Sequence, residues 1–129
     1  MSLEIEATVK TPKIVLDSTS GKILLAGISI PEDPYDFYGP VETEIDSYLK
    51  NPAVNTNLEF QLEYFNTSST LIIRNLIRKL SNSSRDTNLK VHWYYEAYDE
   101  DMKEAGDEFK KLFEELDFEV VEVDEFPIN

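Results

Sequence analysis

The sequence predicts an α/β protein, a two-layer sandwich in which helices cover one face of a mixed β-sheet. Segments rich in β-branched and aromatic residues alternate with segments of helical periodicity, in the order β-β-α-β-α-β-α-β. Each strand, helix, strand unit requires a right-handed crossover between parallel neighbours. Two inner strands alternate apolar and polar residues, so we expect only one face of the sheet to be covered.

The 129 residues fit one domain of common size, which we place over residues 1–129 with an ordered core at about 9–125. No repeat, low-complexity block or linker divides the chain. The short ends, residues 1–8 and 126–129, are expected to be loosely held.

The first elements are a hairpin and a helix. Residues 11–17 (TPKIVLD) and 21–28 (GKILLAGI) are β-rich runs separated by Ser-Thr-Ser-Gly, which predicts a hairpin. PEDPYDFYG follows as a turn-rich loop, Pro40 fits a first helical turn, and Asn51-Pro52 stops the helix. The helix shows apolar residues at helical spacing: Tyr38, Val41, Ile45, Tyr48 and Leu49.

Two later strands, residues 58–65 (LEFQLEYF) and 89–95 (LKVHWYY), alternate strictly. In the first, Leu58, Phe60, Leu62 and Tyr64 share one face, and Glu59, Gln61 and Glu63 share the other. In the second, Leu89, Val91, Trp93 and Tyr95 oppose Lys90, His92 and Tyr94. Each pattern predicts a strand with one wet face.

Two more helices and a last strand complete the pattern. The second helix follows YFNTSST, with Ile73, Leu76, Ile77 and Leu80 on one side. Asp99 offers an N-cap to the third helix, whose apolar positions are Met102, Ala105, Phe109, Leu112, Phe113 and Leu116. FEVVEV, residues 118–123, is the final strand.

Composition excludes several kinds of function. A formal net charge of −14 repels nucleic acid and anionic membrane surfaces. The chain has no cysteine, and no segment approaches the ~20 apolar residues of a membrane span, so we expect a cytoplasmic protein. His92 is the single histidine and has no second ligand or acid at a useful spacing, so we expect no metal, no cofactor and no catalytic residue.

Two other kinds of function stay open as alternatives. A small-ligand or nucleotide sensor would use aromatic residues such as Trp93 and Tyr95 around a pocket. A minor enzyme would depend on His92 and nearby acids. The acid-rich run DEDMKEAGDEF lacks the ligand alternation of an EF-hand and is better explained as the wet face of the third helix.

The hydroxyl cluster in YFNTSST, residues 64–70, is the most informative motif. At about 100° per residue, the apolar side of the second helix is centred opposite Thr67. On the same count Ser69 points toward the core. Leu71, Arg74 and Arg78 lie beside Thr67 on the exposed side.

Two interpretations of this cluster remain possible from the residues alone. Asn66 or Thr67 caps the helix, with the serines filling out its first turn. Alternatively, Thr67, or Ser68 in its place, is phosphorylated, because a helix N-terminus favours an anion. Such a phosphate would change the charge of a contact surface.

The segments TPKIVLD, GKILLAGISIPEDPYDFYGPV, LEYFNTSST and VHWYYEAYDEDMKEAGDEF together resemble the SiaC family of bacterial regulatory phosphoproteins. The resemblance implies a STAS-like fold, related to anti-sigma factor antagonists. It implies that a Ser/Thr kinase phosphorylates Thr67, that a PP2C-type phosphatase reverses this, and that the unphosphorylated form activates a diguanylate cyclase. The family element SYPEN appears here as SIPED, residues 29–33.

We therefore predict a non-catalytic protein-binding switch in c-di-GMP signalling. Neither the residues nor the resemblance sets an oligomeric state. The predicted partner-binding residues lie around Thr67 and along the exposed side of the second helix, or belong to the SIPED element and the aromatic residues next to it: Asn66, Ser68, Ser69, Leu71, Arg74, Arg78, Pro31, Glu32, Tyr35, Phe37 and Tyr38.

Overall fold

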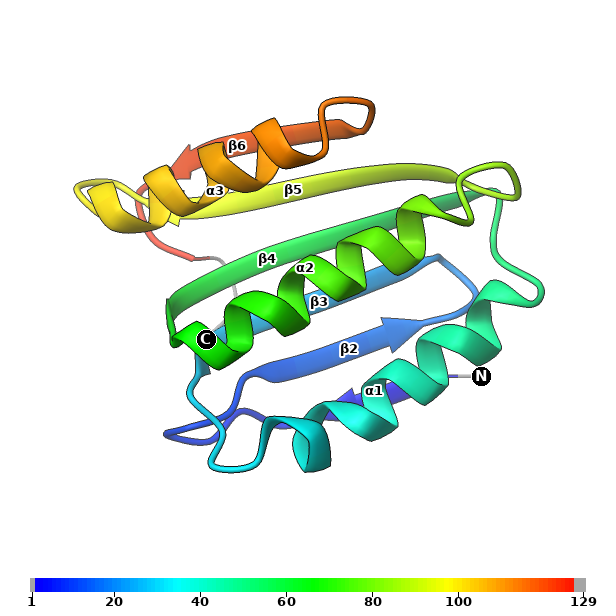
Figure 1. Cartoon of the computed structure of the whole chain (residues 1–129), viewed down its shortest axis with the longest axis horizontal. Coiled ribbons are helices and arrows are strands. Elements are labelled where there is room, and N and C mark those ends of the chain that lie inside the picture. The colour runs from blue at the N-terminus through cyan, green and yellow to red at the C-terminus, as the bar shows by residue number, and fades with distance from the viewer. Residues whose placement is uncertain (1, 127–129) are drawn as a thin grey trace.

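A computed structural model describes residues 2–126 and confirms the predicted fold class (Figure 1). Three helices lie on one face of a six-stranded sheet, with the order β-β-β-α-β-α-β-α-β. The elements are β1 (Ser2–Ile5), β2 (Lys13–Asp17), β3 (Lys22–Ser29), α1 (Pro34–Leu49), β4 (Asn55–Phe65), α2 (Thr67–Ser81), β5 (Asn88–Glu96), α3 (Glu100–Leu112) and β6 (Asp117–Val123).

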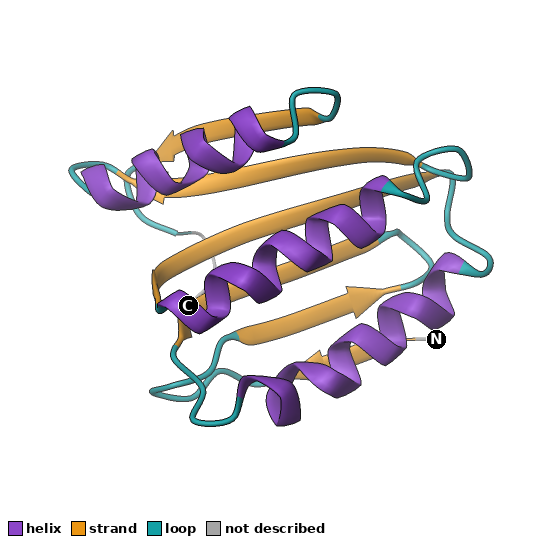
Figure 2. Cartoon of the chain, in the orientation of Figure 1, coloured by secondary structure: helices purple, strands orange, loops and turns teal. Residues whose placement is uncertain are grey.

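The strands are arranged in chain order across the sheet, β1-β2-β3-β4-β5-β6. β1, β2 and β3 pair antiparallel, whereas β3, β4, β5 and β6 pair parallel. Each parallel pair is joined through one helix, as Figure 2 shows. Consequently β3, β4 and β5 end at the same edge of the sheet, where α1, α2 and α3 begin. We call this edge the helix-start end.

β1 corrects the expectation of a loosely held N-terminus. Its four residues pair antiparallel with β2, and Leu3 and Ile5 pack against the core. The segment alternates apolar and polar residues over Leu3, Glu4 and Ile5, which is too short to stand out as a strand without its partner. The element order therefore contains one strand more than predicted.

α1 begins earlier than predicted, because PEDPYDFYG is not a loop throughout. Asp33 is the N-cap and accepts a hydrogen bond from the amide of Asp36 at 3.1 Å. Pro34 fills the first position, where a missing N–H costs nothing. Pro40, assigned to the first turn from the sequence, instead lies inside the helix.

A β-bulge interrupts the alternation of β4. The register with β3 shifts between Gly27 and Ile28, and Gly27 has a φ of +113°, which L side chains rarely adopt. Tyr64 is therefore 57% exposed, and Phe65 packs against the core in its place. The prediction that Tyr64 shares the buried face of β4 is wrong for this reason.

The centre of the sheet face opposite the helices is less exposed to solvent than predicted. Gln61 is only 3% exposed, although its position in the alternation predicted a wet face. Its Cα partner on β3 is Ala26, and Leu24 on the same face is fully buried. Glu59 and Glu63 keep the partial or full exposure that the pattern predicted.

Trp93 organises the core between the sheet and α3. Its ring is fully buried and lies 4.9 Å from the ring of Phe60 and 5.3 Å from that of Phe109. The indole Nε1 donates a hydrogen bond to the carbonyl of Met102 at 3.0 Å, which satisfies its one polar group. Gly106 lets α3 approach the indole, since a Cβ there would lie 2.4 Å from Trp93 Cδ1.

α3 begins as predicted and ends earlier. Asp99 is its N-cap and accepts a hydrogen bond from the amide of Met102 at 3.1 Å. The helix stops at Leu112, which is exposed rather than part of the core, and Phe113 after it is buried. None of the helices within residues 2–126 is long and apolar enough to cross a membrane.

Gly106→Ala is predicted to destabilise the protein. Alanine normally stabilises a helix interior, but here its methyl group would clash with the Trp93 ring. We expect a loss of about 1–3 kcal/mol in the free energy of unfolding, measured in urea. Gly39→Ala in α1 is the matched control, because nothing lies within 4 Å of its Cβ position. An equal effect of both changes would contradict this account of Gly106.

Candidate functional site

The candidate site lies where β4 ends and α2 begins. Asn66 adopts an extended conformation and is the N-cap of α2. Its side-chain oxygen accepts a hydrogen bond from the amide of Ser69 at 3.1 Å. Of the two residues considered as a cap from the sequence, the structure therefore assigns the role to Asn66 and leaves Thr67 as the first helical residue.

The four hydroxyl side chains of the cluster are not equivalent. Ser68 Oγ donates to the Asn66 side chain at 3.0 Å, and Thr70 Oγ1 donates to the Asn66 carbonyl at 3.3 Å. Ser69 is fully buried. Thr67 is exposed, and its hydroxyl makes no hydrogen bond with any residue from 2 to 126. The helical count predicted both the outward position of Thr67 and the inward position of Ser69.

Ser69 belongs to a buried cluster of three hydroxyls with Ser29 and Tyr38. Ser29 Oγ lies 2.6 Å from Tyr38 Oη and 2.8 Å from Ser69 Oγ. Ser69 Oγ also donates to the Ser29 carbonyl at 2.9 Å. These contacts tie the end of β3, the first turns of α1 and the start of α2 together. Burial raises the pKa of Tyr38 to about 12.

The sequence placed Ser29 in the SIPED element but did not show that its side chain contacts Ser69 and Tyr38. Ser29 is the last residue of β3 and pairs with Phe65, the last residue of β4. The amide of Asn66 donates to the Ser29 carbonyl at 3.1 Å. The available signal was the parallel pairing, because the carboxyl ends of adjacent parallel strands meet at one edge.

The exposed side of α2 carries the residues that the sequence placed there. Leu71, Arg74 and Arg78 are all exposed. The Arg78 guanidinium lies 5.2 Å from the centre of the Phe113 ring, a cation–π distance. Lys79 instead bridges to Asp46 of α1 at 2.8 Å.

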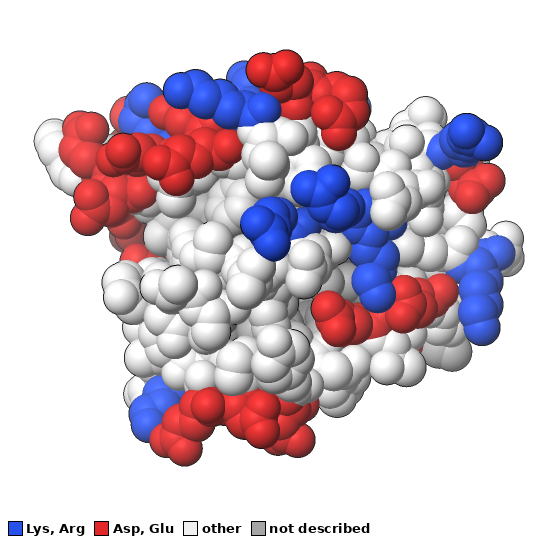
Figure 3. Space-filling view, in the orientation of Figure 1, with Lys and Arg blue, Asp and Glu red and all other residues white. Residues whose placement is uncertain are grey.

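Figure 3 shows the charge distribution on this face. The cationic side chains of α2 form a strip over the middle of the molecule. The area over the start of α2 is uncharged and lies between acidic groups at the start of α3 and near the start of α1.

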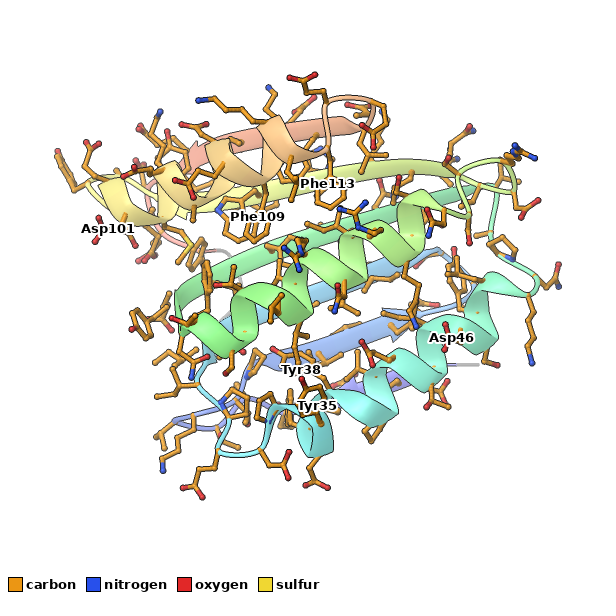
Figure 4. The ribbon with its side chains drawn as sticks, in the orientation of Figure 1. Tyr35, Tyr38, Asp46, Asp101, Phe109 and Phe113 are labelled. Atoms are coloured by element: carbon orange, nitrogen blue, oxygen red, sulfur yellow. The ribbon has the colours of Figure 1, made fainter. Side chains whose placement is uncertain are left out.

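Three of the predicted partner-binding residues are not available to a partner. Ser69 and Tyr38 lie in the buried hydroxyl cluster, and Pro31 is buried as well. The burial of Ser69 and Tyr38 accompanies their hydroxyl contacts with Ser29, which the sequence alone does not show. Figure 4 shows Tyr38 and Tyr35 near the start of α1, and Tyr35 is exposed.

Glu32 and Asp33, the last two residues of the SIPED element, are exposed and make polar contacts. Glu32 accepts a hydrogen bond from Lys10 Nζ at 2.7 Å, and this bond lowers the pKa of the Glu32 carboxyl from its usual value. Asp33 caps α1, a role that Asn and Asp fill about equally. Phe37 is half-buried, with its ring edge-on to Tyr38 at 4.8 Å.

The two alternatives find little support in the geometry. Trp93 and Tyr95 are buried in the core and do not present their rings to a ligand. His92 stacks on Tyr94 and lies 3.9 Å from one carboxylate oxygen of Glu119. Within residues 2–126, no group of three or more His, Cys, Asp or Glu side chains is placed to hold a metal ion.

The fold and the site define a one-sided α/β sandwich that presents a hydroxyl at a helix start and packs Trp93 and Tyr95 into the core. Residues 5–123 match the family described as SiaC family regulatory phosphoproteins. The chain belongs to the SiaC family.

Relatives agree with this assignment. An uncharacterized protein of Pseudomonas aeruginosa (strain UCBPP-PA14) is 30% identical over 112 residues, which cover 84% of this chain and 87% of that protein. The crystal structure of apo-SiaC from Pseudomonas aeruginosa is 25% identical, with a TM-score of 0.79 and coverage of 95% of this chain and 98% of that one.

A second solved structure shows SiaC of the same species in complex with the diguanylate cyclase SiaD, which SiaC activates. That SiaC chain is 26% identical to this one, with a TM-score of 0.81 and coverage of 93% of this chain and 98% of that one.

Asn66→Ala is predicted to lower the free energy of unfolding by about 1 kcal/mol, because it removes the cap of α2. Thr67→Ala should change it by less than about 0.5 kcal/mol, since an exposed hydroxyl without a partner contributes little. Urea unfolding of both variants checks this. A larger loss in Thr67→Ala would mean that Thr67 is the cap.

Tyr38 is predicted to make stability depend on pH above 10. The unfolded chain ionises Tyr38 near pH 10, whereas the folded protein keeps it neutral up to about pH 12. The contribution of Tyr38 to the free energy of unfolding is therefore fully present below pH 10. It falls by about 2–3 kcal/mol as the pH rises from 10 to 12. Tyr38→Phe should lose less over this interval in urea unfolding, and an identical loss would contradict the assignment to Tyr38.

Proposed function

We propose that this chain is a non-catalytic, cytoplasmic phospho-switch whose state is set at Thr67. The observation that carries the proposal is that, of the four hydroxyls in the cluster, Thr67 is exposed and makes no hydrogen bond within residues 2–126. A protein kinase must reach its acceptor hydroxyl, and among the four hydroxyls that of Thr67 is exposed and has no hydrogen bond to break within residues 2–126. Membership of a family of regulatory phosphoproteins supports the same role.

The start of α2 suits a phosphate on physical grounds. The first turn of a helix leaves backbone N–H groups without intrahelical acceptors, and the helix dipole favours negative charge there. Asn66 and the Ser29 cluster hold this turn from the inner side. A phosphate on Thr67 therefore adds a charge of about −1.5 to −2 without displacing a contact that holds the fold.

The phosphate would alter a surface that is otherwise uncharged. Figure 3 shows no acidic or basic side chains over the start of α2. Leu71 lies one turn further along the same exposed side and is 49% exposed. A phosphate here must lose water when a partner covers Leu71, and this desolvation opposes binding.

The proposed partner is based on SiaC of Pseudomonas aeruginosa, whose structure is known in complex with a diguanylate cyclase. SiaC activates the diguanylate cyclase SiaD, and this chain is similar to that SiaC over almost its whole length. We infer that unphosphorylated protein binds and activates a diguanylate cyclase, and so raises c-di-GMP. A Ser/Thr kinase and a PP2C-type phosphatase would write and remove the phosphate.

Phosphorylation is tested with the Ser/Thr kinase of the same organism, ATP and mass-spectrometric peptide mapping. We expect one phosphate on wild-type protein and none on Thr67→Ala, with Ser68→Ala as the matched control that keeps the phosphate. Labelling that persists in Thr67→Ala and disappears in Ser68→Ala would move the site to Ser68.

The switch itself needs a binding measurement with the diguanylate cyclase. Phosphorylated protein and Thr67→Asp should bind at least about tenfold more weakly than wild type, which corresponds to about 1.4 kcal/mol. Thr67→Val, similar in shape and uncharged, should bind as wild type. Unchanged affinity for the phosphorylated protein would refute the switch.

A further inference from the structure

Exposed apolar side chains gather at the helix-start end. Seven large hydrophobic residues are exposed among those described: Val9, Tyr35, Val54, Tyr64, Leu71, Tyr98 and Leu112. Val54 and Leu112 lie at the opposite end, before β4 and at the close of α3. The others lie in the connection before β2, at the ends of β4 and β5, or in the first turns of α1 and α2. Tyr35 thus lies in the first turn of α1, Tyr64 near the end of β4, and Tyr98 between β5 and α3.

Tyr98 is the most unusual of these residues. It has a φ of +76°, a left-handed conformation that Gly and Asn adopt more readily than Tyr. It is the third residue of a turn closed by a hydrogen bond from the Asp99 amide to the Glu96 carbonyl at 3.0 Å. Its side chain is 99% exposed, so no contact within the described chain offsets the strain.

Charged groups border these tyrosines on two sides. The first turn of α3 carries Glu100 and Asp101, and Asp99 caps it. Asp33 and Asp36 lie at the start of α1. Lys10 pairs with Glu32, and Lys103 pairs with Asp107 at 3.0 Å, whereas Arg74, three residues after Leu71 on α2, is exposed. Figure 3 shows the resulting arrangement, an uncharged area between two acidic borders.

We propose that Tyr35, Tyr64, Leu71 and Tyr98 form one docking surface for a protein segment that carries apolar residues flanked by Lys or Arg. Tyr98 is its anchor. Aromatic side chains give large contact area, and basic residues of the partner match the two acidic borders. The proposal rests on the proposed function and extends its contact surface from α2 to the start of α3.

The position of Thr67 explains why a basic partner would still be released by phosphorylation. Thr67 is the first residue of α2 and precedes Leu71 by one helical turn, and the area over the start of α2 is uncharged. The basic groups of the partner are directed to those borders. The phosphate would face apolar contacts and would have to be dehydrated without a matching charge.

The test measures stability and affinity on the same variant. Tyr98→Asn relieves the left-handed strain, so its melting temperature should rise by about 2–4 °C. Its affinity for the diguanylate cyclase should nevertheless fall at least about tenfold. Tyr98→Phe keeps the ring and should bind within about threefold of wild type. A structural role alone would not make stability and affinity change in opposite directions.

Val54→Ser is the matched control, since it removes an exposed apolar side chain from the opposite end and should leave affinity unchanged. Tyr98→Asn with wild-type affinity would overturn the docking surface, whatever Thr67→Asp does. If Tyr98→Asn weakens binding and Thr67→Asp does not, the phospho-switch fails and the docking surface stands.

A probe independent of the cyclase decides the proposal if the cyclase does not bind. An amphipathic Leu/Lys peptide is titrated into labelled protein and followed by amide chemical shifts. The shifts should concentrate at Tyr35, Tyr64, Leu71 and Tyr98, and a Leu/Glu peptide should produce none. Shifts spread over all acidic surfaces, including the neighbourhood of Leu112, would overturn the proposal.

Discussion

The parallel pairing of β3 with β4 is the constraint on which the rest of the site depends. It brings Ser29 beside Phe65, so that the Ser29 carbonyl accepts hydrogen bonds from both the Asn66 amide and the Ser69 hydroxyl. One carbonyl therefore fixes the first turn of α2. The same pairing, repeated from β4 to β5, places the starts of all three helices at one edge of the sheet.

The fold class followed from periodicity because α2 and β5 each have one buried side and one exposed side. Such patterns are local and survive without knowledge of neighbours. The predictions that were wrong concern features that depend on neighbouring strands. β1 needs β2 to be recognised, and the shift between Gly27 and Ile28 is a property of two strands together. Gln61 is buried because of the residues that surround it, although its position in the alternation of β4 predicts a solvent-exposed side chain.

In the candidate site, too, the features set by local periodicity were predicted, and those that depend on contacts between distant segments were not. The outward position of Thr67 follows from the phase of α2, which was set from Ile73, Leu76, Ile77 and Leu80, and the structure agrees. The contact between Ser29 and Ser69 was missed because the two residues lie 40 positions apart in the chain. Pro31 was assigned to the surface because nothing in its own segment shows what covers it, whereas the helical spacing of Tyr38 with Val41 and Ile45 already indicated a buried side.

The single tryptophan gives this molecule an intrinsic optical reporter. Trp93 is fully buried, so its fluorescence will change when the protein unfolds. Its ring also meets that of Phe65 edge-on at 5.9 Å, and Phe65 immediately precedes the N-cap of α2. The indole is thus one side chain away from the candidate site, and a change in the backbone at the start of α2 would reach it without any added label.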